Sequence, residues 1–104
     1  MYRVFRSEWY EKKLKKLDRS EQNRVLKFEQ ALKGEPQNSK PLGYPFLREK
    51  KFHEKRIIFL VYEKHKCIFL VTITGKKAQQ SEIDAIKANL DVYQEELEKI
   101  IKGL

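Results

Sequence analysis

Basic side chains gather in the middle of this 104-residue chain. Six of the nine residues from 48 to 56 are basic, and they are Arg48, Lys50, Lys51, His53, Lys55 and Arg56. A lysine pair, Lys76 and Lys77, follows after a mostly apolar stretch. Because like charges repel, a fold that gathers cations does so where it is to bind an anion. The chemistry that these residue types suggest is the binding of phosphate groups.

Two apolar strands would bring the basic segments together. Residues 56–62 and 67–74 are nearly continuous apolar runs, joined by the polar segment 63–66. Such runs predict two buried strands in an antiparallel hairpin. The start of one strand then lies beside the end of the other. We therefore expect Arg56 to lie close to Lys76 and Lys77 at one end of the sheet.

The basic run itself indicates a further strand over residues 46–52, in which alternate side chains share a face. Strict alternation predicts Arg48 and Lys50 on one face, and Lys51, His53 and Lys55 on the other. Taken alone, the run also fits a solvated edge strand that charge protects from aggregation. The convergence of three basic segments at one end of the sheet favours a polyanion site instead.

The rest of the chain supplies a scaffold. Residues 2–6 indicate a short first strand, and Ser7 is suited to cap a helix over 8–17. Asp18 and Glu21 have the spacing of a capping box for a helix over 19–33. Residues 35–45 form a loop that leads into the sheet.

From about residue 79, apolar residues at steps of three and four predict a final helix. The expected fold is a single α+β domain over 1–104. It has an N-terminal strand and helical hairpin, an antiparallel sheet of about four strands, and a C-terminal helix.

Charge is distributed unevenly along the chain. The formal net charge is +8, of which residues 1–34 carry +5, residues 35–78 carry +6 and residues 79–104 carry −3. A basic body with an acidic last segment suggests a polyanionic partner such as nucleic acid.

Several classes of protein are not expected. The apolar runs are far shorter than the roughly 20 residues that span a bilayer, so we expect no membrane association. A single cysteine, Cys67, excludes an internal disulfide and suggests a reducing compartment, the cytoplasm. His65 and Cys67 lack a second ligand cluster, so we expect no metal and no cofactor.

The order of these motifs resembles the RelE/ParE superfamily of toxins from type II toxin–antitoxin modules. Its members have an arginine that opens an apolar strand, as in residues 55–62, and a second apolar strand that ends in a basic pair, as in residues 69–77. A helix begins shortly afterwards, matching residues 78–85. Upstream, residues 40–42 and 48–52 resemble the loop and charged strand of the family.

The resemblance implies a small toxin that a cognate antitoxin wraps and neutralises. Many RelE-type members are endoribonucleases that cleave mRNA on the ribosome without a metal, and the well-filled basic positions favour this branch. ParE-type members inhibit DNA gyrase instead. A third hypothesis is a non-catalytic member that binds RNA or antitoxin. Self-association stays open.

RNA carries its own nucleophile, the 2′-hydroxyl group. Its cleavage requires a base for that hydroxyl, cations for the phosphate and a proton for the leaving oxygen. By resemblance, Arg56 and Lys77 hold the phosphate, and Lys51 or alternatively Lys50 is the base. His53 is a candidate proton carrier because imidazole titrates near neutrality. The remaining cations, Arg48, Lys50, Lys55 and Lys76, would bind RNA.

The chain also departs from the family pattern. Several RNase members have a tyrosine near the start of the last helix, where this chain has Ser81-Glu-Ile-Asp84. Some have arginine at the position of Lys77, and lysine lacks the planar guanidinium fork.

Overall fold

The computed structural model describes residues 1–36 and 38–104. The strands are β1 (Arg3–Arg6), β2 (Lys40–Pro41), β3 (Leu47–Phe52), β4 (Lys55–Tyr62) and β5 (Cys67–Gly75). The helices are α1 (Glu8–Lys15), α2 (Arg19–Leu32), α3 (Gln79–Ala88) and α4 (Leu90–Lys102), and a 3-10 turn, η1, covers Glu63–His65. This α+β content confirms the predicted fold class.

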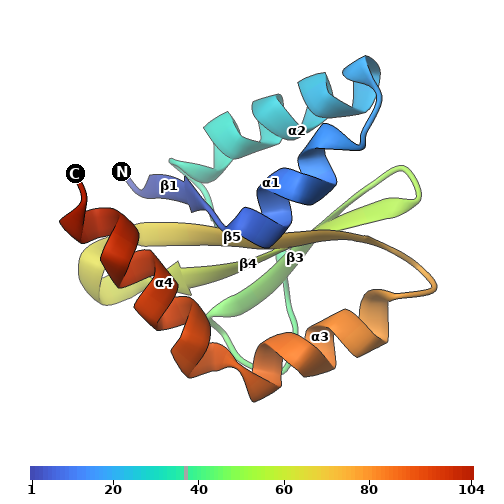
Figure 1. Cartoon of the computed structure of the whole chain (residues 1–104). Helices are drawn as coiled ribbons and strands as arrows, with labels where there is room; N and C mark the ends of the chain where they lie inside the picture. The colour runs from blue at the N-terminus through green and yellow to red at the C-terminus, as the bar shows by residue number, and fades with distance from the viewer. Residues whose placement is uncertain (37) are drawn as a thin grey trace.

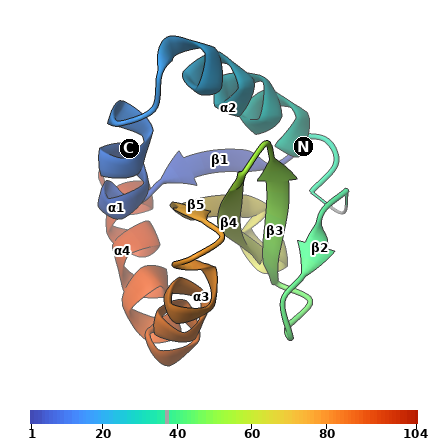
Figure 2. The same ribbon diagram turned by 90° about the vertical axis from the view of Figure 1, so that its right-hand side faces the viewer.

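A single mixed sheet forms the centre of the molecule, in the strand order β1-β5-β4-β3-β2 (Figures 1 and 2). The predicted antiparallel pairing of β4 with β5 is confirmed, and β3 also pairs with β4 in antiparallel. Two features differ from the prediction: β1 pairs with β5 in parallel, and the two-residue β2 adds a fifth strand. The polar, proline-rich loop sequence around β2 gives no strand pattern.

Helices cover both faces of the sheet (Figure 1). On one face, Ile57, Phe59 and Leu70 pack in one core cluster with Tyr10 of α1 and Val25 of α2. On the other, Ile58, Leu60, Phe69 and Val71 pack with Ile83 and Ile86 of α3 and Leu97 of α4. Each fully buried large apolar side chain stabilises the fold by about 1.5–3 kcal/mol. The two-sided burial explains why β4 and β5 are apolar throughout.

Local signals set the helix starts. The Ser7 hydroxyl accepts a hydrogen bond from the Tyr10 amide at 3.0 Å and caps α1. Asp18 accepts from the Glu21 amide at 2.8 Å, and Glu21 accepts from the Asp18 amide at 3.4 Å, so the predicted capping box is present.

The predicted single C-terminal helix is in fact two helices. The break lies at Asn89, whose φ of −127° is not helical. Its side-chain amide donates to the Ala85 carbonyl at 2.7 Å. Asparagine favours such local bonds over continued helix, which explains the break. Within the described residues, no helix combines the length and apolar content needed to cross a bilayer.

Candidate functional site

A pocket of ≈ 430 Å³ lies where β2, β3 and β4 meet. It is lined by Asn38, Ser39, Lys40, Glu49, Lys50, Lys51 and Arg56. Of these described residues, four are basic and one is acidic, which gives the lining a net charge of +3. A positive, open pocket of this kind is suited to an anion. We call it the cationic pocket.

Strand pairing sets the position of Arg56 in the cationic pocket. Arg56 is the second residue of β4. It pairs with Lys51 of β3 on one side and with Thr74 of β5 on the other. Only 14% of its side chain is exposed, whereas Lys50 and Lys51 are exposed. Arg56 is therefore held by the sheet, and the lysines reach into solvent around it.

Glu49 is the acidic member of the pocket. Its carboxylate Oε1 lies 3.8 Å from Nε of Arg56 and accepts a hydrogen bond from Nε2 of Gln79 at 2.8 Å. The first distance exceeds that of a hydrogen bond, so the two form a loose ion pair. The guanidinium is partly compensated in place, and Gln79 links the pocket to the start of α3.

The lysine pair lies at the expected end of the sheet. Gly75 pairs with Lys55, and Thr74 pairs with Arg56, so the segment after β5 leaves beside the start of β4. Lys76 and Lys77 are both exposed there, but neither lines the cationic pocket. The structure thus places the lysine pair at the same end as Arg56, outside the pocket.

Lys55 lies on the opposite face from the one that alternation predicts. The turn between β3 and β4 is only two residues long, His53 and Glu54, so that Lys55 pairs directly with Phe52. Directly paired residues share a face, and Phe52 packs on the α1–α2 side. Nζ of Lys55 lies 3.8 Å from Oε2 of Glu21 on α2. The prediction that Lys55 and Lys51 share a face is wrong because the turn interrupts the alternation.

Arg48 binds the chain's own backbone. Its Nε donates to the Ser39 hydroxyl at 2.7 Å, its Nη2 to the Ser39 carbonyl at 2.6 Å and its Nη1 to the Pro45 carbonyl at 2.9 Å. Arg48 therefore fixes the loop on either side of β2, which is a structural role in addition to any contact with RNA.

His53 occupies the β3–β4 turn. Its φ of 51° lies in the left-handed region, its side chain is exposed, and its ring lies 6.4 Å from that of Phe52. The turn places the imidazole at the end of the hairpin and outside the cationic pocket.

Solved structures of RelE toxins share this architecture. A double arginine-to-alanine variant of E. coli RelE in the free state matches with a TM-score of 0.71 at 19% identity, over 84% of this chain and 96% of that chain. Isolated E. coli RelE matches with a TM-score of 0.66 at 17% identity, over 85% and 98%. The RelE–RelB complex of Pyrococcus horikoshii matches with a TM-score of 0.64 at 25% identity, over 72% and 94%.

The chain has the RelE toxin fold. No protein-family model and no curated protein matches the sequence, so the likeness is one of fold.

Several residues at the cationic pocket were not predicted from the sequence, among them Lys40, Glu49 and Gln79. Lys40 enters through its pairing with Glu49, and that pairing depends on the unforeseen strand β2. Glu49 lies on the same face of β3 as Leu47 and Lys51, because alternate residues of a strand share a face. This spacing was sufficient to predict that Glu49 lies beside Lys51. Gln79 carries no signal of its own, because its contact with Glu49 depends on how α3 packs.

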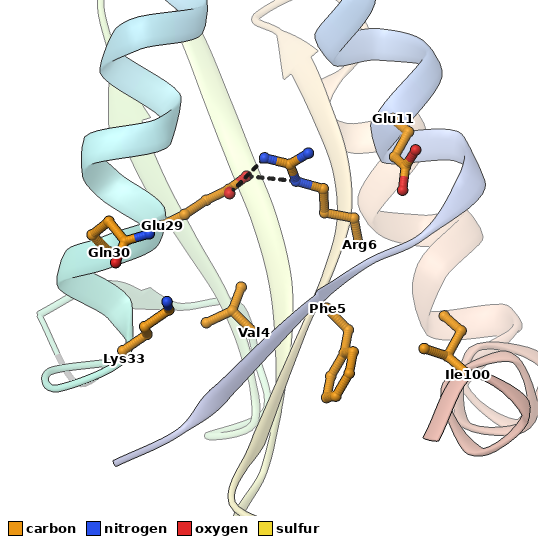
Figure 3. A pocket seen from close by; sticks show the side chains of 8 residues that line it. All are labelled: Val4, Phe5, Arg6, Glu11, Glu29, Gln30, Lys33 and Ile100. Atoms are coloured by element: carbon orange, nitrogen blue, oxygen red, sulfur yellow. Dashed lines mark hydrogen bonds and ion pairs between the residues drawn. The ribbon is translucent and has the colours of Figure 1, made fainter. Parts of the chain in front are cut away.

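A second pocket of ≈ 440 Å³ lies beside β1, between α2 and the C-terminal part of the chain (Figure 3). Here Arg6 donates to both carboxylate oxygens of Glu29, at 3.1 and 2.8 Å. The Tyr10 hydroxyl also donates to Glu29, at 2.8 Å. These mutually compensated groups tie β1 and α1 to α2, and they leave the cationic pocket as the better anion site. Across the described ranges, no cluster of three or more His, Cys, Asp or Glu side chains has an arrangement suited to a metal.

Proposed function

We propose that this RelE-like chain is the toxin of a toxin–antitoxin pair and cleaves mRNA on the ribosome. The observation that carries the proposal is the cationic pocket, in which the sheet fixes Arg56 beside Lys51 with a net lining charge of +3. The fold supports an antitoxin partner, since solved RelE toxins of E. coli and Pyrococcus horikoshii are bound to RelB antitoxins.

The proposed reaction uses the nucleophile that RNA itself provides. The 2′-oxygen attacks the adjacent phosphorus, a new P–O2′ bond forms and the P–O5′ bond breaks. One product ends in a 2′,3′-cyclic phosphate, and the other begins with a 5′-hydroxyl. The 2′-hydroxyl must lose a proton, and the leaving 5′-oxygen must gain one.

The residues divide between charge stabilisation and proton transfer. Arg56 contacts the scissile phosphate from its fixed place, and Lys77 approaches it from the exposed segment after β5. Cations at these positions stabilise the extra negative charge of the transition state. Lys51, the cross-strand partner of Arg56, is the proposed base, with Lys50 as the alternative in the same pocket. His53 on the neighbouring turn is the candidate proton donor.

Alanine substitution at Arg56 tests this proposal. We expect Arg56→Ala to lower transcript cleavage in a purified translation system by at least about 100-fold, the usual effect of losing one such contact. Growth arrest on expression should be lost in parallel. Lys64→Ala is the matched control, because it removes an equally positive but remote charge at the far end of the β4–β5 hairpin. Full cleavage by folded Arg56→Ala would contradict the proposed site.

A second candidate function is favoured by Glu49. A carboxylate 3.8 Å from Arg56 competes with a bound phosphate for the guanidinium, while the lysines of the pocket still permit RNA binding. A non-catalytic RNA-binding or antitoxin-binding role would show salt-sensitive RNA affinity without any cleavage. Loss of DNA supercoiling with intact transcripts would instead identify inhibition of gyrase.

A further inference from the structure

Two aromatic rings stand exposed on the loop between β2 and β3. The rings of Tyr44 and Phe46 are stacked, with their centroids 4.9 Å apart and their planes at 21°. They are 41% and 39% exposed. Core packing does not require large aromatic rings at this degree of exposure, so the pair calls for a separate explanation. We call it the aromatic platform.

The loop that carries the platform is held rigidly. The Leu42 amide donates to the Leu47 carbonyl at 2.8 Å, the Leu47 amide to the Tyr44 carbonyl at 3.2 Å, and the Val61 amide to the Phe46 carbonyl at 2.8 Å. Arg48 adds its bond to the Pro45 carbonyl. A ring on a rigid loop loses little conformational freedom when a ligand stacks on it, which favours binding.

The surroundings of the platform are positive. Nζ of Lys87 lies 5.8 Å from the centroid of the Tyr44 ring. Gly43 has a φ of +93°, and a Cβ there would lie 2.9 Å from Nζ of Lys87, so glycine permits this approach. Residues 38–48 contain no aspartate or glutamate. A flat aromatic group attached to a polyanion fits such a surface, and a nucleobase of single-stranded RNA has both properties.

The platform and the cationic pocket lie along the same elements. Phe46 immediately precedes β3, and Glu49 of the pocket lies three residues further on, about 10 Å along the strand. Helix α3 contacts both sites, through Gln79 at Glu49 and through Lys87 at Tyr44. A strand of a few nucleotides can therefore reach both.

We propose that the aromatic platform stacks on a base of the RNA strand whose backbone occupies the cationic pocket. The inference rests on the proposed function, because it takes RNA as the ligand. It adds a contact that selects single-stranded RNA and fixes its register relative to Arg56, and Arg48 acts as a positioning residue for the loop.

Fluorescence of 2-aminopurine tests the platform directly. Short single-stranded RNAs carry the fluorescent base at one position each, and fluorescence and anisotropy are recorded at several salt concentrations. We expect quenching at one or two adjacent positions. The double variant Tyr44→Leu and Phe46→Leu keeps apolar volume but removes the π faces. It should abolish the quenching and weaken binding about tenfold with an unchanged salt slope.

Two further variants separate stacking from stability. Phe46→Trp replaces one aromatic ring by another and should retain the quenching. Leu26→Ala, which truncates an equally exposed apolar side chain on α2, should change neither signal. Quenching that survives in the double leucine variant would overturn the inference. Absence of quenching at every labelled position in the wild type, whether or not RNA binds, would also overturn the inference. A double leucine variant that binds RNA normally and loses only affinity for a protein partner would overturn it as well.

The same samples distinguish the two proposals. Position-specific quenching without ribosome-dependent cleavage would support base stacking on the aromatic platform and contradict the proposed nuclease activity. Cleavage without quenching would do the reverse.

Discussion

Arg56 and Glu49 come from neighbouring strands and hold their charged groups 3.8 Å apart at the edge of the cationic pocket. Both side chains are largely buried, at 14% and 8% exposure. A bound phosphate must therefore compete with Glu49 for the guanidinium. In exchange, Glu49 and Gln79 hold Arg56 in one orientation before the ligand arrives.

Replacing Glu49 separates these two effects. We expect Glu49→Gln to tighten binding of single-stranded RNA, because the net charge of the pocket lining rises by one. Cleavage should fall because Arg56 loses its orienting partner. Anisotropy titration and transcript cleavage measure the two quantities. Glu54→Gln on the exposed turn is the control for net charge.

The pH profile of the same variant tests the role of Lys51 as base. If Glu49 only positions Arg56, the profile of Glu49→Gln keeps the shape of the wild-type profile at lower amplitude. Loss of its acidic limb would instead identify Glu49 as the base.

Salt dependence reports which lysines touch phosphate. Each phosphate contact contributes about 0.7 to the slope of log K against log salt for single strands. We expect Lys50→Ala to reduce the slope by about that amount, because Lys50 lines the cationic pocket. Lys64→Ala should leave the slope unchanged. Equal slopes for both variants would place the RNA elsewhere.

The ion pair of Arg6 with Glu29 (Figure 3), together with the Tyr10 hydroxyl that donates to Glu29, contributes to stability. Glu29→Ala leaves Arg6 and Tyr10 without their shared acceptor. We expect a loss of about 2 kcal/mol in the free energy of unfolding, below the value for a fully buried pair because the Arg6 side chain is 33% exposed. Tyr10→Phe should cost about 1 kcal/mol. Denaturant unfolding measures both, and Glu95→Ala on an exposed helix face should stay within about 0.5 kcal/mol of wild type.

Tyrosine burial makes the fold sensitive to alkali. Burial first, and the charge of Glu98 second, raise the pKa of Tyr62 to about 12 from its usual 10.0. Burial and the neighbouring carboxylate of Glu29 raise the pKa of Tyr10 further.

Because both pKa values are raised, the stabilisation is complete below pH 10.0 and declines as the pH rises above it. For Tyr62 the decline occupies the range from 10.0 to about 12. Each tyrosine adds a slope of at most about 1.4 kcal/mol per pH unit. Unfolding of Tyr62→Phe at several pH values in this range should show a shallower decline than wild type, and parallel curves would contradict the assignment.

The sequence was sufficient to predict what repeating patterns and local caps determine. Ser7 and Asp18 marked their helix starts, and the apolar runs over β4 and β5 marked the centre of the sheet. The expectation that Arg56 and the lysine pair lie at one end of the sheet followed from that hairpin. These features depend on neighbours along the chain or on a simple period, and both can be read without coordinates.

Other features depend on contacts between distant residues. A two-residue turn determines the face of the sheet on which Lys55 lies. Lys40 pairs with Glu49 through a strand of two residues, which is too short to show an alternating pattern in the sequence. Gln79 reached Glu49 through the packing of α3. The hydrogen bonds of Arg48 to the loop around β2 could not be predicted, because charge alone does not show which acceptors the backbone will offer.

The parallel pairing of β1 with β5 joins Arg3 to Cys67, so the first strand pairs with a segment that lies 64 residues further along the chain. Closing so long a loop is slow, whereas the β3–β4 hairpin that carries the cationic pocket pairs locally. During synthesis at the ribosome, the nascent chain therefore assembles the segment bearing Arg56 early but completes the framework that steadies it only after β5 has emerged. A partly made chain therefore lacks the complete sheet that fixes Arg56 between Lys51 and Thr74.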